Sequence, residues 1–255
     1  MTITIDGAPI LAYLLASIRI LAFLVTAPPF NNLAIPNMVK VILSLGLSMA
    51  VASQLQLAAL PSNWYASMVI ALTQVLIGVG MGFVTRLLLT AISVAGSFID
   101  LFGNFQIAAA YDPLSLNQNS VFGRFYEMIM FTLIFVTGAD LLILGGLLNT
   151  FRYLPLDGSP DLSAWPTVFT TAVSLFFTIA VQIALPLVSV LFITNLALAL
   201  TTKIAPTLQP LMVMQPVTIG LTLILVGSSF AVIPTALDRI TDLINDAIAT
   251  LGGAK

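Results

Sequence analysis

Long apolar runs alternate with short polar or proline-containing turns along the whole chain. Each run is close to, or longer than, the ~20 residues that a membrane-spanning helix needs. Prolines, glycines and asparagines gather between the runs, as they do in turns. The pattern predicts an all-α protein of about six long, partly kinked helical segments arranged as hairpins, at residues 10–27, 38–60, 64–102, 121–154, 167–202 and a last run that ends near residue 234.

The composition places these segments in a membrane. Of the 255 residues, 59% are hydrophobic and 7% are charged, and the mean hydropathy is +1.11. A soluble domain carries about 25% charged residues. Because the apolar runs recur along the whole length, we expect a membrane-associated helical bundle rather than a soluble domain with a single anchor.

Two of the runs are longer than a simple membrane crossing. An unbroken helix over residues 64–102 would be about 58 Å long, close to twice the ~30 Å hydrocarbon core of a bilayer. We therefore expect this run either to break or to leave the bilayer plane. In the run at residues 167–202, Pro186 should kink the helix, because its ring removes a backbone hydrogen bond and crowds the preceding turn.

The central stretch, residues 96–120, is where amides, hydroxyls and aspartates replace the hydrocarbon side chains. Lipid cannot satisfy such groups, so this stretch must line water or lie against other protein. One interpretation is a plug that fills a pore at rest and is displaced without leaving uncompensated charges. The alternative is an ordinary solvent-exposed connection. The plug would occupy about residues 104–120, and its candidate residues are Phe105, Gln106, Tyr111, Asp112, Pro113, Leu114, Leu116 and Asn117.

Glycines in the third run predict close helix packing. Gly78 and Gly82 have the spacing that lets two helices approach each other, and Gly96 is a further helix-packing candidate. A phosphate-binding glycine loop does not fit, because no strand precedes these glycines and no acidic residue follows at the required distance.

Residues 155–166 form the clearest linker, because prolines and glycines are dense there. The linker divides the chain into residues 1–154 and residues 167–255. The second part ends in an amphipathic helix, Leu237–Leu251, whose apolar stripe is opposed by three aspartates. Because that acidic face would not be attracted to an anionic membrane surface, we expect this helix to dock on protein.

The residue types that are absent exclude much of enzyme chemistry. The chain has no histidine and no cysteine, which removes the usual general base, the commonest metal ligands and the thiol nucleophile. We expect no enzymatic activity, no metal site and no cofactor. Since the net charge is −2 and no basic cluster is present, we also expect no nucleic-acid partner.

Several motifs, in order along most of the chain, resemble the FliR/SctT family of type III secretion export-apparatus proteins. They are a proline-bracketed turn followed by a basic residue (Pro28, Pro36, Lys40), the glycine motif with Gly78 and Gly82, then Gly96 with Asp100 and Gly103, Asp112 with Pro113, Phe151–Pro155, and a basic turn at Lys203 and Pro206. The chain has Lys203 where the family usually has arginine. A lysine offers a point charge rather than a planar fork, which puts any arginine-specific contact there in doubt.

The resemblance implies a single-copy subunit of the flagellar export gate, located in the bacterial inner membrane and the flagellar basal body. Such a subunit forms a closed channel with FliP-like and FliQ-like membrane proteins, contacts an FlhB-like switch protein and membrane lipid, and passes unfolded export substrates. By the same resemblance, residues 1–154 are FliP-like, residues 167–255 contain a FliQ-like hairpin, and part of the helical mass stands above the membrane on the periplasmic side. The loop at about 104–120 corresponds to the family's pore plug.

A different class of protein also fits the hydropathy pattern. An ion-coupled secondary transporter of a small solute would use Asp100, Glu127 and Asp140 as proton or sodium sites near the midplane of the membrane. Such a transporter would move solute as an isolated chain, whereas a gate subunit would need its partners.

Overall fold

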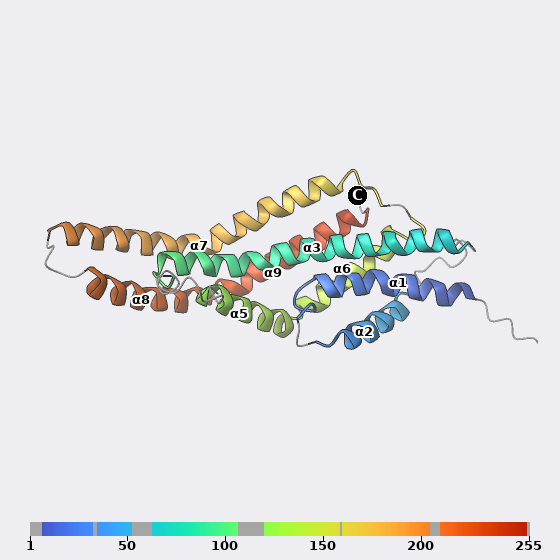
Figure 1. The fold of residues 1–255 in the computed structure, drawn as a ribbon, viewed down its shortest axis with the longest axis horizontal. Helices are drawn as coiled ribbons and strands as arrows, with labels where there is room; N and C mark the ends of the chain where they lie inside the picture. The colour runs from blue at the N-terminus through green and yellow to red at the C-terminus, as the bar shows by residue number, and fades with distance from the viewer. Residues whose placement is uncertain are drawn as a thin grey trace, which may run out of the picture. The chain divides into compact units, whose positions relative to one another are not determined.

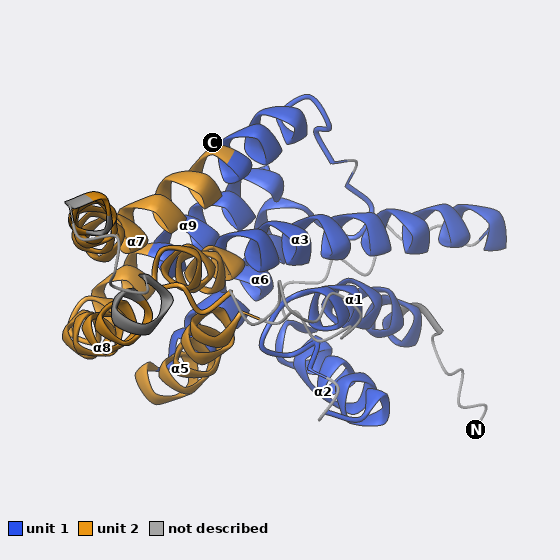
Figure 2. Cartoon of the chain, turned by 60° about the vertical axis from the view of Figure 1, so that its left-hand side comes forward, with its two compact units in different colours: residues 1–88, 138–173, 240–255 blue, residues 89–137, 174–239 orange. Residues whose placement is uncertain are grey.

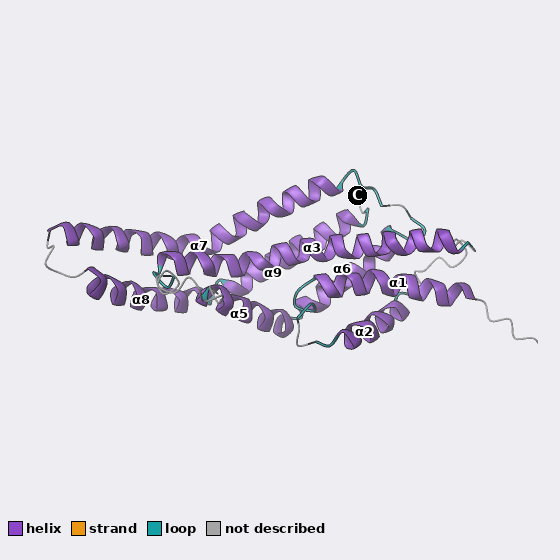
Figure 3. Ribbon diagram, in the orientation of Figure 1, coloured by secondary structure: helices purple, strands orange, loops and turns teal. Residues whose placement is uncertain are grey.

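The computed structural model describes residues 7–32, 35–52, 63–106, 120–158, 160–204 and 210–253. Over these ranges Figure 3 shows helices joined by loops, without a strand. The helices in Figure 1 are α1 (Gly7–Thr26), α2 (Asn37–Ala50), α3 (Trp64–Phe102), α5 (Val121–Thr137), α6 (Ala139–Tyr153), α7 (Trp165–Ile204), α8 (Pro210–Ser229) and α9 (Ile233–Leu251). Three of them are long and apolar enough to cross a membrane, or up to five spans if each broken helix pair counts as one. The prediction of an all-α membrane protein is confirmed.

The six predicted segments correspond to α1, α2, α3, the pair α5 and α6, α7 and α8, and the predicted amphipathic helix Leu237–Leu251 corresponds to α9. The run at residues 121–154 was expected to be one segment, but Gly138 interrupts it with a φ of 75°. An L residue rarely adopts this left-handed conformation, so glycine is the residue that allows the break. Of the predicted run at residues 38–60, helix α2 covers the part up to Ala50, and residues 53–62 lie outside the described ranges.

Helix α3 shows how the longest apolar run is accommodated. It is continuous over its 39 residues, so it is about 58 Å long. Even at the ~40° upper end of observed helix tilts it would span about 45 Å along the membrane normal, more than the ~30 Å hydrocarbon core. The run therefore does not break, and α3 is longer than the hydrocarbon core of a bilayer.

Helix α7 is also continuous, over 40 residues that include Pro186. Figure 1 shows α7 changing direction partway along its length, as a proline in a helix interior causes.

The described helices contribute to two compact units, coloured separately in Figure 2. Unit 1 comprises residues 1–88, 138–173 and 240–255, and unit 2 comprises residues 89–137 and 174–239. The predicted division at residues 155–166 remains a prediction, because spatial units do not show which partner each part of the chain resembles.

In unit 1, helix α2 packs against α1 and has its polar side turned inward. Lys40, Ser44 and Ser48 are buried, and the two serine hydroxyls donate to backbone carbonyl oxygens of the same helix. The outward side is apolar, with Met38 70% exposed and Met49 68% exposed. This arrangement is the reverse of a water-soluble amphipathic helix, so the outer face of α2 is suited to lipid or to another protein.

Helix α9 has the predicted apolar stripe. Leu237, Ile240, Ile244, Ile248 and Leu251 are buried, and Asp238, Asp242 and Asp246 are exposed. Thr241 is a polar residue that is also buried on this helix, at 2% exposed. The stripe is covered by the protein itself, in agreement with the expectation that this helix docks on protein.

In unit 2, helices α5 and α8 are joined by polar and aromatic contacts. The hydroxyls of Tyr126 and Ser229 are 2.6 Å apart and hydrogen-bonded. Phe125 precedes Tyr126 and Phe230 follows Ser229, and the rings of these two phenylalanines meet edge to face with their centroids 5.8 Å apart. These contacts fix the position of α5, the helix that follows the central polar stretch.

Candidate functional site at the base of the central polar segment

The central polar segment leaves helix α3 and returns at helix α5, and the structure describes both of its ends. We use the term segment base for residues 100–106 and 120–123. Asp100, in the last turn of α3, is 1% exposed. Its carboxylate accepts hydrogen bonds from the backbone N–H of Phe122 at 3.1 and 3.2 Å and from the hydroxyl of Ser120. The carboxylate therefore joins the end of one helix to the start of the next.

Ser120 caps helix α5. Its Oγ accepts from the N–H of Gly123 at 2.7 Å, which is the usual bond between an N-cap serine and the third residue of a helix. The same hydroxyl donates to Asp100. A serine hydroxyl has one donor and two acceptor positions, so both bonds are chemically compatible. The first N–H groups of α5 have no partner within the helix, and the positive end of the helix dipole there also favours a negative charge.

Gly96 allows α3 and α5 to meet at this point. A Cβ atom on Gly96 would overlap the backbone of Phe122 and would lie 2.6 Å from the nitrogen of Gly123. Because the two backbones are in contact, a short aspartate side chain reaches the first N–H groups of α5. Sequence reasoning singled out Gly96 for helix packing without identifying the segment that it approaches.

The other end of the segment base lies at the end of α3. Asn104 has a φ of 62°, and the N–H of Phe105 donates to the carbonyl oxygen of Asp100 at 3.1 Å. This bond with an asparagine in the left-handed region is typical of a Schellman-type helix end. The side chain of Asn195 on α7 donates to the carbonyl oxygen of Phe102 at 2.9 Å, which satisfies another group at the end of the helix.

Asn195 also connects this end to α8. Its Oδ1 accepts from the amide of Asn104 at 3.4 Å and from the hydroxyl of Thr218 at 3.3 Å. Nearby, Gly103 lies so close to Thr222 that a Cβ would be 2.8 Å from the Thr222 hydroxyl oxygen. Helices α3, α7 and α8 thus converge on the residues where the polar segment starts.

The two ends of the segment touch each other. The rings of Phe105 and Phe122 meet edge to face with their centroids 4.9 Å apart, a favourable geometry for an aromatic pair. Phe105 and Gln106 are the predicted plug residues that the structure describes, and Gln106 is exposed. The other predicted plug residues, Tyr111, Asp112, Pro113, Leu114, Leu116 and Asn117, lie outside the described residues.

A polar pocket opens beside the segment base. Its volume is about 250 Å³, and its walls include Ser93, Ser120, Arg124 and Glu127. Within the described ranges Arg124 and Glu127 form no ion pair, although their spacing on a helix is compatible with one. Two charged side chains thus line a pocket in a chain that has few charges.

The glycines Gly78 and Gly82 lie against helix α1. A Cβ on Gly78 would overlap the carbonyl oxygen of Arg19 and lie 2.8 Å from the Cβ of Ala22, and a Cβ on Gly82 would lie 2.8 Å from the Cβ of Thr26. The two positions therefore allow the first and third helices to approach backbone to backbone, the arrangement for which small residues are used in membrane proteins.

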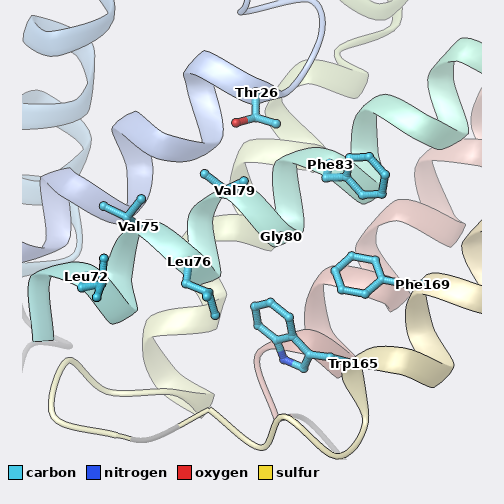
Figure 4. A pocket seen from close by; sticks show the side chains of 9 residues that line it. All are labelled: Thr26, Leu72, Val75, Leu76, Val79, Gly80, Phe83, Trp165 and Phe169. Carbon is cyan, nitrogen blue, oxygen red and sulfur yellow. The ribbon is translucent and has the colours of Figure 1, made fainter. Parts of the chain in front are cut away.

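Gly80, which lies between these two glycines in the sequence, packs against Trp165 instead of α1. Trp165 lies over it, and a Cβ on Gly80 would be 2.8 Å from the indole ring. Figure 4 shows Trp165, Phe169 and Phe83 along an apolar pocket of about 440 Å³. The indole N–H of Trp165 is buried and has no hydrogen-bond partner within the described part of the chain. The pocket offers contact with hydrocarbon groups and no polar recognition.

Arg19 is a buried residue whose role sequence reasoning did not identify. It is 0% exposed, and its guanidinium donates to the Gln74 amide oxygen at 2.6 Å, to the Thr150 hydroxyl at 3.2 Å and to the Leu154 carbonyl oxygen at 3.0 Å. It also lies 4.2 Å from the centre of the Phe151 ring. The sequence feature that could have indicated this role is the single charge within an apolar run, because such a charge has to find partners inside the protein.

The remaining predicted positions lie at turns and helix ends. Pro28 is buried in the turn after α1, and Pro36 is the residue before α2. Lys40 is 6% exposed on the inward side of α2. Lys203 is exposed in the last turn of α7, and Pro206 lies outside the described residues. Among the described residues, no group of three or more acidic side chains is arranged to hold a metal ion.

Comparison with known proteins gives the class of protein to which this fold and site belong. Residues 10–244 match the family model of bacterial export proteins, family 1, and the chain belongs to this family. The curated proteins that it resembles include a flagellar biosynthetic protein FliR from Escherichia coli K12, with 31% identity over 79% of this chain and 77% of the relative. The FliR of Pectobacterium carotovorum is 30% identical over 92% and 90% of the two chains, and that of Aquifex aeolicus is 32% identical over 86% and 85%. The resemblance to the FliR/SctT family is thus confirmed.

Proposed function

We propose that this protein is a single-copy subunit of the flagellar type III export gate. In this role it forms, with FliP-like and FliQ-like membrane proteins, the closed channel through which unfolded flagellar proteins cross the inner membrane. It also contacts an FlhB-like switch protein and works without catalysis. The proposal is supported by membership of the bacterial export family and by relatives that are named flagellar biosynthetic proteins.

The exposed surface supports a role inside an assembly. Along the beginning of α3, Trp64 is 76% exposed and Leu72 is 70% exposed, and on α6 Leu141 is 69% exposed. Soluble monomers rarely expose large contiguous apolar patches. We propose that neighbouring subunits and lipid share these surfaces.

The lengths of α3 and α7 support a position partly outside the bilayer. Both helices are longer than the hydrocarbon core, at 39 and 40 residues. Apolar residues beyond the lipid need cover from protein, because water would be in contact with them otherwise. We propose that neighbouring subunits provide this cover on the periplasmic side. In the same assembly, residues 1–154 would take a FliP-like place and residues 167–255 a FliQ-like place.

We propose that the central polar segment, at about residues 104–120, closes the channel at rest. The observation that carries this proposal is the segment base, where buried and part-buried hydrogen bonds fix both ends of the segment to α3, α5, α7 and α8. A plain solvent-exposed connection needs no such anchoring, because loops at a surface have water as their partner.

The test is a variant from which residues 108–118 are removed, expressed together with the partner subunits. We expect the assembly to form and the membrane conductance of the cells for small ions to rise above that of the native protein. Asp157→Ala, at an exposed position of the linker, is the control and should leave the conductance unchanged. An assembled complex with the deletion and with native conductance would contradict the plug.

The transporter alternative is less well supported by the geometry. Asp100, one of its candidate ion sites, has its carboxylate engaged with Ser120 and Phe122. Solute uptake by the isolated chain in liposomes would favour the transporter, and inactivity without partners is expected for a gate subunit.

A further inference from the structure

We infer that Asp100 and Asn195 are positioning residues, which hold the two ends of the central polar segment at a fixed separation. The inference rests on the proposed function, because the separation matters to a segment that closes a channel. It concerns described residues only: the end of α3, the start of α5, and one side chain on α7.

Asp100 provides more than a helix cap. Ser120 alone satisfies the N–H of Gly123, as an N-cap residue does. The carboxylate of Asp100 adds bonds from the N–H of Phe122 and from the Ser120 hydroxyl, and both come from across the polar segment. The free energy of these bonds therefore stabilises the attachment of α5 to α3 rather than α5 by itself.

Because Asp100 is buried, only a narrow range of positions of α5 relative to α3 allows this attachment. The residue is 1% exposed, and within the described ranges it forms no ion pair with a lysine or arginine. A buried carboxylate without a cation depends on its hydrogen-bond donors and on the positive end of a helix. Because few arrangements supply both, moving α5 away from α3 would leave the charge unsatisfied.

Asn195 acts in the same way at the other end. Its amide hydrogen bond to the Phe102 carbonyl oxygen holds the last turn of α3 against α7, and its oxygen receives bonds from Asn104 and Thr218. The side chain thus uses its donor toward the end of α3 and its acceptor toward both the end of α3 and α8. An apolar residue of similar size would keep the packing and lose the anchoring.

Together, the two residues define where the segment leaves and where it returns. The contact of the Phe105 and Phe122 rings at 4.9 Å is the result of both attachments.

The experiment measures the separation of the two ends directly. The chain has no cysteine, so Gln106→Cys and Val121→Cys, both at exposed positions, introduce a unique pair for nitroxide labels. The labelled protein is purified as the assembled complex, and the dipolar broadening of its continuous-wave electron paramagnetic resonance spectrum is recorded. We expect clear broadening in the otherwise native chain.

Substitutions at the two positioning residues should change that spectrum. We expect the broadening to fall at least twofold in Asp100→Ala and in Asn195→Ala, and to be largely retained in Asp100→Asn, which keeps an acceptor oxygen. Leu101→Ala and Thr194→Ala are the matched controls, because Leu101 is exposed and the hydroxyl of the half-buried Thr194 bonds to the Val190 carbonyl oxygen of its own helix. Unchanged broadening in Asp100→Ala or in Asn195→Ala overturns the assignment of that residue.

A second variant and a second readout cover the remaining outcomes. If Asp100→Ala does not accumulate, Asp100→Glu replaces it, since the longer side chain displaces the carboxylate, and an unchanged spectrum again overturns the assignment. Conductance is measured in parallel with the variant that lacks residues 108–118. If that deletion does not raise conductance, the plug fails, while a loss of broadening in Asp100→Ala still supports the positioning role.

Discussion

The guanidinium of Arg19 donates its Nε hydrogen to the side-chain oxygen of Gln74 at 2.6 Å, although 55 positions separate the two residues in the chain. The Gln74 amide in turn donates to the carbonyl oxygen of Leu156 at 3.1 Å. The pair thus connects α1 and α3 to the segment that follows α6. In a chain with few charges, this buried chain of hydrogen bonds organises unit 1.

Arg19→Leu should therefore destabilise the protein. The substitution removes a buried charge but leaves the Gln74 and Leu154 oxygens without a donor, and each unsatisfied acceptor costs ~1–3 kcal/mol. We expect a loss of about 2 to 4 kcal/mol in the free energy of unfolding, seen as a lower midpoint of thermal unfolding in mild detergent. Arg152→Leu, at an exposed position, should leave the midpoint within a degree or two of the native value, roughly as surface substitutions do. A second substitution, Gln74→Leu, should cost less in the Arg19→Leu background than in the native chain, and equal costs would contradict the coupling.

Gly78→Ala should destabilise the packing of α1 on α3. The new methyl group would overlap the carbonyl oxygen of Arg19, which belongs to a helix backbone and cannot turn aside. Overpacking of this kind costs ~1–3 kcal/mol. Gly145→Ala is the control, because nothing lies within 4 Å of its Cβ position and alanine favours a helix interior over glycine by ~0.5–1 kcal/mol. The thermal midpoints of the two variants should move in opposite directions, and a rise for Gly78→Ala would show that the helices do not meet there.

The hydrogen bond between Tyr126 and Ser229 should be measurable as a coupling between α5 and α8. The two oxygens are 2.6 Å apart, and both residues are buried. In a double-mutant cycle with Tyr126→Phe and Ser229→Ala, we expect a coupling free energy of ~0.5–1.5 kcal/mol from unfolding in detergent. Thr132→Ala with Ser229→Ala is the control pair, since the exposed Thr132 bonds within its own helix. A coupling no larger than that of the control pair would be evidence against the bond.

Helix type and extent were predictable where composition is uniform. The run at residues 64–102 forms α3 over Trp64–Phe102, because no strong helix breaker interrupts an apolar run and its ends are marked by polar turns. The break at Gly138 was not predictable in the same way. Glycine is common inside membrane helices, so a single one carries no sign of the left-handed conformation that interrupts the helix.

The chemistry of the segment base was only partly accessible from the sequence. The polar composition of residues 96–120 pointed to the region, since amides and carboxylates need partners in an apolar protein. The bond between Asp100 and Ser120 depends on where α3 ends and where α5 begins, 20 positions apart, and on the close approach at Gly96. The role of Asn195 was even less predictable from the sequence, because its partners Phe102 and Thr218 come from different helices.

Helix α2 has a consequence for how this sequence is free to change during evolution. Met38, Ile42 and Met49 face outward. Any apolar residue would be tolerated at these positions, so substitutions that keep them hydrophobic are expected to be accepted. At Lys40, Ser44 and Ser48 the inward surface meets α1, and a larger or purely hydrocarbon replacement would disturb the pairing. Lys40, Ser44 and Ser48, which lower the hydropathy of this segment, are therefore the residues that specify how α1 and α2 pair.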